Sequence, residues 1–239
     1  MSDYRSTRST ITGVTLWRAV RDESHQGILP DGVMDLMWFQ DELVVAGPDT
    51  HCVSIPVSVG DSTWGLRFDP GVAHALLRIS VRELRNERVP LVDIVPVPPI
   101  HPQRLEDMFI ALWDHARPDA CALRLATSID RAARNGETVQ QIAARHEMSE
   151  RSLRRLCDAE FGYGPSMLSQ IHRFQAALHL LREGVPPGEV ASSTGYADQA
   201  HLSREMKRFA DQTPSQIAHT PAMADSFKTP GRPHGTMAS

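Results

Sequence analysis

The hydrophobic positions in the first third of the chain occur in short segments that are rich in β-branched and aromatic residues. Turn sequences interrupt these segments at 30–32 (Pro-Asp-Gly), 47–49 (Gly-Pro-Asp) and 60–61 (Gly-Asp). Short strand-like segments separated by turns are typical of a small β-rich domain. We expect strands at Thr15–Val20, Met34–Phe39, Leu43–Ala46, Val53–Val59 and Thr63–Phe68, and a strand-like segment at Val89–Ile94.

After the turn at 69–71 the pattern changes to helical stretches. Short helices are expected at Val72–Leu77 and Ser80–Arg85. The segment 96–102 then has four prolines, which neither a helix nor a central strand tolerates, and it predicts a stiff connector. Two bridging helices and a helical region to about 219 should follow, because apolar residues recur at helical spacing at Leu105, Met108, Phe109, Leu112, Trp113, Leu125, Ile129 and Ala133.

This order of elements predicts an α+β fold, with a β-rich N-terminal domain followed by an all-α domain. The expected boundaries are 1–95 for the β-rich domain, 96–127 for a helical connector and 128–220 for the all-α domain. Residues 221–239 are expected to form a disordered tail, because they are rich in Pro, Gly, Ser and Thr and have few apolar residues.

The helical region contains an internal repeat. Two copies of one helical unit, which differ by one residue in the turn, explain matches at two neighbouring offsets. At an offset of 49 the matches are Leu153 with Leu202, Arg155 with Arg204, Pro165 with Pro214 and Ser166 with Ser215, and at an offset of 48 Ile142-Ala143 matches Val190-Ala191.

The first copy reads as a helix, a tight turn and a second helix. Thr138 and Gln141 have the spacing of a capping box, and a break follows at 146–147. Ser149 is the expected N-cap of the second helix, and Gly162 ends it. This arrangement is a helix-turn-helix motif.

The second copy repeats the arrangement after a longer helix. Gly195 ends a short helix, and Asp198 caps the next one. Between the copies, Ser166–Leu181 forms an amphipathic helix of about 16 residues, or about 24 Å. A spacer of this length helps to hold two recognition helices about one turn of B-DNA apart, roughly 34 Å, in successive major grooves.

The outer faces of the two second helices hold the candidate DNA contacts. Arginine suits this role because its planar donors match guanine O6 and N7, and glutamine can pair with adenine in the same bidentate way. His201 is expected to read a base or to contact a phosphate. The exposed positions should be Glu150, Arg151, Arg154 and Arg155 in the first helix and Gln199, His201 and Arg204 in the second.

The segment 195–204 (Gly-Tyr-Ala-Asp-Gln-Ala-His-Leu-Ser-Arg), with 211–215 (Asp-Gln-Thr-Pro-Ser), resembles the C-terminal signature of AraC/XylS-type transcriptional regulators. The resemblance implies a DNA-binding module with two subdomains. The sequence departs from the family pattern at Glu147 and Asp211, where glycine is common, and at Met206, where phenylalanine is usual. The implied base-reading positions are Glu150, Arg151, Arg154, Arg155, Gln199, Ala200, His201 and Arg204.

The segments 28–36, 45–50 and 65–71 resemble the β-rich companion domain of an actinobacterial-type subset of these regulators. By analogy this domain senses a small molecule, mediates dimerisation, or does both. Its aromatic residues are expected in the core. If some line a cavity instead, the first candidates for an effector pocket are Trp17, Trp38, Trp64, Arg67 and Phe68.

The charge of the chain does not by itself predict DNA binding. The 239 residues carry a net charge of −4, of which residues 1–127 contribute −5 (12 Arg against 17 acidic residues) and residues 128–239 contribute +1 (13 basic against 12 acidic). A DNA-binding function must therefore depend on where the arginines lie. Three scattered cysteines favour reduced thiols, and the absence of a long apolar segment favours a cytoplasmic protein with no membrane partner.

Catalytic and metal sites are weakly supported by the sequence. The segment 146–150 is a broken zinc motif, with glutamate in place of the second histidine, and 162–165 lacks the residues of a phosphate loop. Neither a metal nor another cofactor is expected. Turn roles, with hydrogen bonds to their own backbone, are expected for Asp31, Asp35 and Asp49, and structural roles for His51, Cys52 and Cys157.

The sequence therefore predicts a sequence-specific transcriptional regulator that binds double-stranded promoter or operator DNA. RNA polymerase, a small-molecule effector and a second copy of the chain are further candidate partners. The alternative is a small-molecule-binding protein or an enzyme for which DNA attachment is secondary. Salt dependence distinguishes the two, because specific DNA binding weakens as salt rises.

Overall fold

The computed structural model describes residues 3–8, 13–20, 25–39, 41–56, 60, 62–96 and 104–219. Its N-terminal part is built on an antiparallel sheet of six strands in the order β1-β2-β7-β4-β5-β8, and β3 pairs with β6 in a separate two-stranded sheet. The strands are β1 (Asp3–Arg8), β2 (Val14–Val20), β3 (His25–Ile28), β4 (Asp35–Phe39), β5 (Glu42–Ala46), β6 (Val53–Pro56), β7 (Ser62–Phe68) and β8 (Arg88–Pro90).

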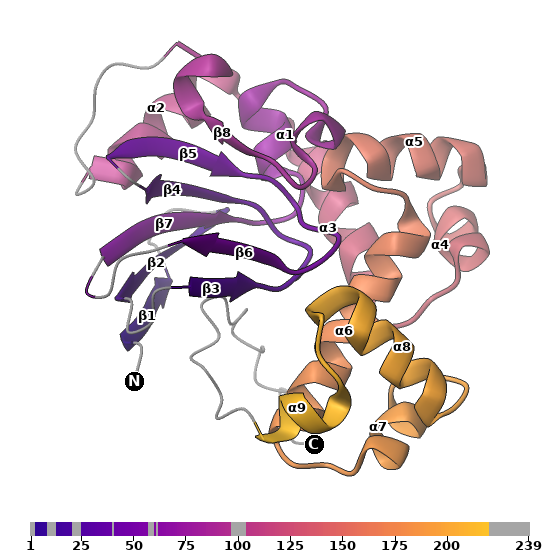
Figure 1. Cartoon of the computed structure of the whole chain (residues 1–239). Coiled ribbons are helices and arrows are strands. Elements are labelled where there is room, and N and C mark those ends of the chain that lie inside the picture. Colours follow the sequence, from indigo (N-terminus) through magenta and orange to yellow (C-terminus); the bar gives the residue numbers. More distant parts are fainter. Residues whose placement is uncertain are drawn as a thin grey trace, which may run out of the picture.

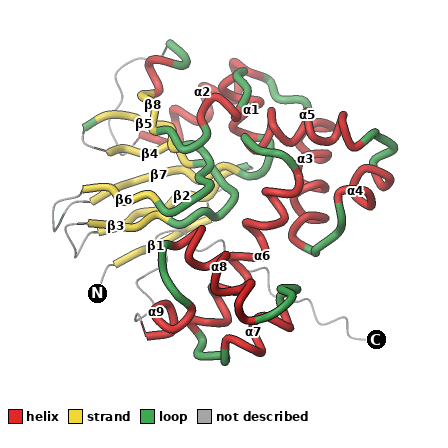
Figure 2. The backbone as a smooth tube through the Cα atoms, turned by 45° about the vertical axis from the view of Figure 1, so that its right-hand side comes forward, coloured by secondary structure: helices red, strands yellow, loops and turns green. Residues whose placement is uncertain are grey.

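Helices α1 (Val72–Leu77) and α2 (Leu105–Ala116) lie on one side of the large sheet, and the β3–β6 pair lies on the other (Figure 1). Two 3₁₀ turns, η1 (Val81–Leu84) and η2 (Leu91–Asp93), flank β8. The rest of the described chain is helical, as Figure 2 shows. Its helices are α3 (Ala120–Arg134), α4 (Val139–Arg145), α5 (Glu150–Phe161), α6 (Pro165–Arg182), α7 (Pro187–Ser193), α8 (Gln199–Ala210) and α9 (Pro214–His219).

Two main hydrophobic clusters divide these elements. The side of the sheet that faces α1 and α2 forms one cluster with those helices, and α3 to α9 form the other around α6. α2 therefore packs with the sheet, whereas α3 packs with the helical domain. The α+β fold class is confirmed, and the domain boundaries at 95, 127 and 220 stay a prediction.

The structure corrects three details of the predicted elements. The segment 89–94 is not one strand, because β8 ends at Pro90, which has no amide hydrogen to continue the sheet, and a 3₁₀ turn follows. The segment 80–85 is likewise a 3₁₀ turn, η1, and not an α-helix. Strands β1 and β3 were not predicted, because their sequences are mainly polar. The predicted strand residues 57–59, most of the proline-rich segment and the tail 221–239 lie outside the described residues.

Candidate DNA-recognition interface

The first bihelical unit consists of α4 and α5, and its predicted caps are present. The backbone N–H of Thr138 donates to Gln141 Oε1 over 2.8 Å, and the Thr138 hydroxyl accepts from the Gln141 amide over 3.2 Å. Ser149 Oγ accepts from the amide of Ser152 over 3.1 Å and so caps α5. Glu147 adopts a φ of 53°, the left-handed conformation that glycine adopts most readily. The turn thus keeps the left-handed conformation with glutamate at a position where glycine is common in the family, at the cost of backbone strain.

The second unit, α7 and α8, has the same architecture. Gly195 has a φ of 76°, and Asp198 Oδ1 accepts from the amide of His201 over 2.6 Å at the start of α8. α8 ends at Ala210, and its C-cap Asp211 has a φ of 56°, which is again left-handed. Lys207 stabilises this end, because its Nζ lies 2.6 Å from Asp211 Oδ1 and donates to the Asp211 carbonyl over 3.0 Å.

The sequence repeat is a structural repeat. Both helices of each unit bury the matched apolar positions, and α6 and α9, which start at Pro165 and Pro214, follow α5 and α8 in the same way. α6 and α9 therefore occupy equivalent positions after α5 and α8. The matched residues that are at most 4% exposed are Ile142, Ala143, Leu153, Val190, Ala191 and Leu202.

The candidate DNA contacts lie at the N-terminal ends of α5 and α8. One face of each helix is buried in the core, so the opposite face points outward. The buried residues are Leu153 and Cys157 in α5 and Leu202, Met206 and Phe209 in α8. The outward residues are free of the core and available to a partner. Exposed are Glu150, Arg151, Arg154, Arg155, Gln199, Ala200 and Arg204, and His201 is half-buried.

α6 joins the two units and is held by polar contacts as well as by its apolar face. His172 Nε2 lies 2.7 Å from Asp130 Oδ1 of α3, with both side chains buried. Burial raises the pKa of Asp130, but the hydrogen bond and charge of His172, together with Arg134, outweigh it and leave the pKa below its usual value. Near the other unit, Arg208 of α8 donates to Gln170 Oε1 over 3.0 Å.

The N-terminal domain contacts α5 near the C-terminal end of that helix. η1 and α1 both pack against α5, and His74 Nε2 of α1 lies 3.9 Å from Glu160 Oε1. Burial raises the pKa of Glu160, and His74 opposes the shift. Gly162 permits this approach, because a Cβ at 162 would lie 2.7 Å from Pro48 Cγ and 3.1 Å from the carbonyl oxygen of Val81.

A second contact joins the 30–32 turn to α6. Gln175 Nε2 donates to the carbonyl oxygen of Pro30 over 2.5 Å. A Cβ at Gly32 would lie 3.3 Å from His172 Cε1 and 3.6 Å from Tyr163 Oη, so the turn rests directly on these side chains. We call these two contacts, at α5 and at α6, the domain seam.

The five candidate effector residues do not share one cavity. Trp38, Trp64 and Phe68 pack in the cluster beneath α1 and α2, whereas Trp17 lies in the cluster on the opposite face of the sheet. Arg67 is buried on the Trp17 face, because neighbouring positions along β7 alternate between faces. Trp17 covers Gly65, where a Cβ would lie 2.4 Å from the indole ring.

A buried network of acids and arginines lies beside these residues. Arg67 Nη2 lies 2.9 Å from Asp31 Oδ2, and its Nε lies 3.4 Å from Asp35 Oδ1. Trp17 Nε1 donates to the same Asp35 oxygen over 2.8 Å. Burial raises the pKa of Asp31 to about 6, with Arg67 opposing the shift and Asp35 adding to it.

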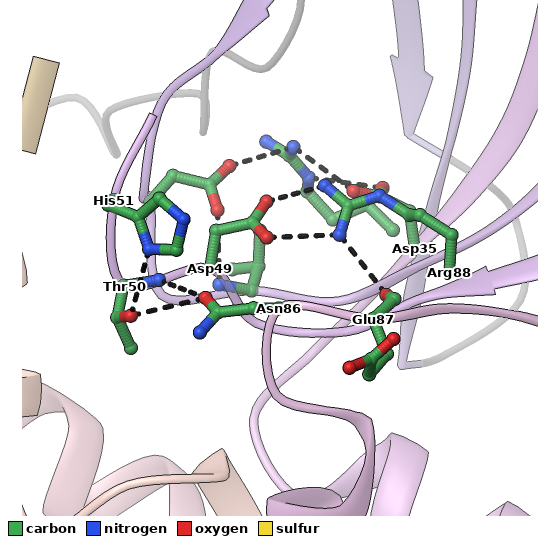
Figure 3. Close-up of polar contacts among 10 residues, drawn as sticks. Asp35, Asp49, Thr50, His51, Asn86, Glu87 and Arg88 are labelled. Atoms are coloured by element: carbon green, nitrogen blue, oxygen red, sulfur yellow. Dashed lines mark hydrogen bonds and ion pairs between the residues drawn. The ribbon is translucent and has the colours of Figure 1, made fainter. Parts of the chain in front are cut away.

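Figure 3 shows the neighbouring part of this network. Both Asp49 oxygens accept from Arg88, at 3.0 and 2.6 Å, and Asn86 Oδ1 accepts from the amide and hydroxyl of Thr50. Asp49 is therefore an ion-pair partner, and the sequence-based turn role holds only for Asp31, which does accept from the amide of Val33. The pairings are far apart in sequence, so no local pattern revealed them.

Within the described ranges, no three histidine, cysteine or acidic side chains come together as a metal site. Each helix in the same ranges is too short or too polar to cross a bilayer.

Two family models match the chain. A helix-turn-helix domain matches residues 142–220, and a domain of unknown function, DUF6597, matches residues 11–90. No curated protein matches the chain.

Three similar solved structures have low sequence identity to the chain. The C-terminal domain of the response regulator AraT from Geobacillus stearothermophilus is 22% identical, and the match covers 49% of this chain and 96% of that one, with a TM-score of 0.38. ToxT from Vibrio cholerae O395 is 10% identical over 90% of this chain and 96% of its own, with a TM-score of 0.45. An unsaturated fatty acid-bound ToxT from strain SCE256 is 12% identical over 89% and 97%, with a TM-score of 0.43.

The helix-turn-helix match coincides with the repeated bihelical units, and the DUF6597 match coincides with most of the sheet. The chain therefore contains an AraC-type helix-turn-helix domain at residues 142–220 and a DUF6597 domain at residues 11–90, and the first of these supports a function as a DNA-binding transcriptional regulator.

Proposed function

We propose that α5 and α8 read two successive major grooves on one face of operator DNA. The observation that carries the proposal is the repeat, which gives both helices a side-chain N-cap, a buried apolar face and an exposed N-terminal end. α6 has 18 residues and is therefore about 27 Å long, which is compatible with two readers roughly 34 Å apart. The proposed contacts are Glu150, Arg151, Arg154, Arg155, Gln199, Ala200, His201 and Arg204.

The arginines supply most of the recognition chemistry in this proposal. Arg155 and Arg204 are equivalent in the repeat and exposed, and each guanidinium can donate two hydrogen bonds to one guanine. Arg151 and Arg154 are placed to contact a neighbouring base or a phosphate, because they lie on the same exposed stripe. Glu150 precedes this stripe at the start of α5 and can accept from a cytosine amino group.

We further propose that the N-terminal domain sets the orientation of the first reader through the domain seam. The seam contacts α5 at Glu160 and Gly162, whereas Glu150 to Arg155 stay exposed. A small molecule in the N-terminal domain, or dimerisation through it, would act by changing this orientation or the spacing of the readers. RNA polymerase contact is a separate expectation.

The test begins with selection of duplexes from a random pool by the full chain. Binding of the selected duplex should weaken as salt rises, in proportion to the phosphates contacted. Arg155→Ala and Arg204→Ala should each lose about 1–3 kcal/mol of binding free energy and relax one base position. Arg104→Ala is the control, since this exposed arginine directly precedes α2, which packs against the sheet and not in the helical domain. Failure to enrich any duplex, or unchanged affinity in both reader variants, would refute the proposal.

A further inference from the structure

The turn of the second unit holds an aromatic ring between α6 and α8. Tyr196 is only 5% exposed, and the guanidinium carbon of Arg173 lies 4.6 Å from the centre of its ring. Arg173 Nη1 also donates to the carbonyl oxygen of Gly195 over 3.4 Å. A side chain of α6 thus fixes the turn that precedes α8, by a cation–π contact and a hydrogen bond together.

The same tyrosine ring fixes His201. The two rings meet edge to face, with centroids 5.2 Å apart and planes at 87°. The imidazole has one hydrogen bond in the turn, because the backbone N–H of Ala197 donates to His201 Nδ1 over 3.4 Å. An Nδ1 that accepts a hydrogen bond carries no proton, so the neutral ring carries its proton on Nε2. Among the described residues, Nε2 has no hydrogen-bond partner of its own.

We propose that His201 determines operator specificity as a hydrogen-bond donor, through Nε2–H, and that Arg173 and Tyr196 are the positioning residues that hold its ring. This inference rests on the proposed function. The acceptors at the major-groove edge are guanine O6 and N7, adenine N7 and thymine O4, whereas cytosine presents an amino donor there. His201 therefore favours a base with an acceptor and disfavours cytosine, and it differs from Gln199, which can both donate and accept.

The tautomer is tested without DNA. Long-range ¹⁵N–¹H correlation spectra of the full chain should show His201 with its proton on Nε2, and the resonance is identified by its loss in His201→Gln. Arg173→Lys keeps the charge but loses the planar stacking group, so the tautomer preference should weaken. Tyr196→Phe is the matched control, because it keeps the ring that Arg173 and His201 contact. A wild-type proton on Nδ1 would overturn the inference.

Base reading is tested by selection from randomised duplexes. His201→Ala should lose discrimination at one base pair by about tenfold and leave the other positions unchanged. His201→Gln retains an N–H donor at the end of the side chain and should keep part of that preference. Arg173→Lys should weaken the preference at the same base pair. Tyr196→Phe should retain it.

The outcomes of the two tests separate the inference from the proposed function. If His201→Ala weakens binding equally for all sequences, the residue contacts a phosphate and the specificity inference is wrong. If it changes nothing, His201 is no contact at all. If the wild-type chain enriches no sequence, the proposed function fails, whatever tautomer the spectra show.

Discussion

Replacing Gly162 by alanine should disturb the domain seam, and a matched variant separates this effect from backbone strain. Gly162 and Gly184 both follow a helix, with φ values of 80° and 82°. A left-handed non-glycine residue costs about 1–2 kcal/mol. At Gly184 nothing lies within 4 Å of the added Cβ, so Gly184→Ala should lose only this amount of unfolding free energy.

Gly162→Ala has the same backbone cost and a steric one in addition. Its Cβ would lie 2.7 Å from Pro48 Cγ and 3.1 Å from the Val81 carbonyl oxygen, which belong to the N-terminal domain. Overpacking of this kind costs about 1–3 kcal/mol if the seam stays closed, so the total loss should be about 2–5 kcal/mol. If the seam opens instead, the loss is smaller and the contacting backbone becomes accessible.

Two measurements read these outcomes together. Urea unfolding gives the loss of free energy, and hydrogen exchange of segments 47–50 and 81–84 reports an opened seam. Gly162→Ala should lose more free energy than Gly184→Ala, or exchange faster in these two segments, or both. Equal losses together with wild-type exchange would show that the N-terminal domain does not press on α5 as described.

Two further predictions follow from the buried titratable groups. The folded-state pKa of Asp31 is about 6 against 3.8 for the free side chain, so its contribution to stability is full below pH 4 and is lost as pH rises to 6. Asp31→Asn has no carboxyl group at this position and should not lose this stability. The unfolding free energy of the variant minus that of the wild type should therefore increase between pH 4 and 6.5, by roughly 3 kcal/mol at most. A difference that does not change with pH would contradict the raised pKa. Burial, with Asp158 and Glu160, raises the pKa of the Cys157 thiol to about 12, so iodoacetamide at pH 8 should alkylate exposed Cys121 well before Cys157 in native protein. Peptide mass spectrometry measures the order, and rapid labelling of Cys157 would show that its helix face is open.

The helical half of the fold was predictable because its determinants are local. Thr138 and Gln141 lie three residues apart, and the caps at Ser149 and Asp198 act within one turn. The matches at offsets of 48 and 49 between the copies then located both units.

The N-terminal half was less predictable because its determinants are not local. Whether Trp17 and Trp64 share a face depends on strand register, and the structure places them on opposite faces of the sheet. Arg67 meets Asp31 and Asp35 only after β4 and β7 have paired. The domain seam was also not predictable, since the apolar pattern of a helix does not indicate which surface will cover the C-terminal end of α5.

The most direct test of the two-reader account is hydroxyl-radical footprinting of the full chain on a selected duplex. The account predicts two protected patches on one face of the DNA, centred about 10 base pairs apart. Arg155→Ala should weaken protection mainly in one patch and Arg204→Ala mainly in the other. A single patch, or two patches on opposite faces of the duplex, would contradict the claim that α5 and α8 read the same operator side by side.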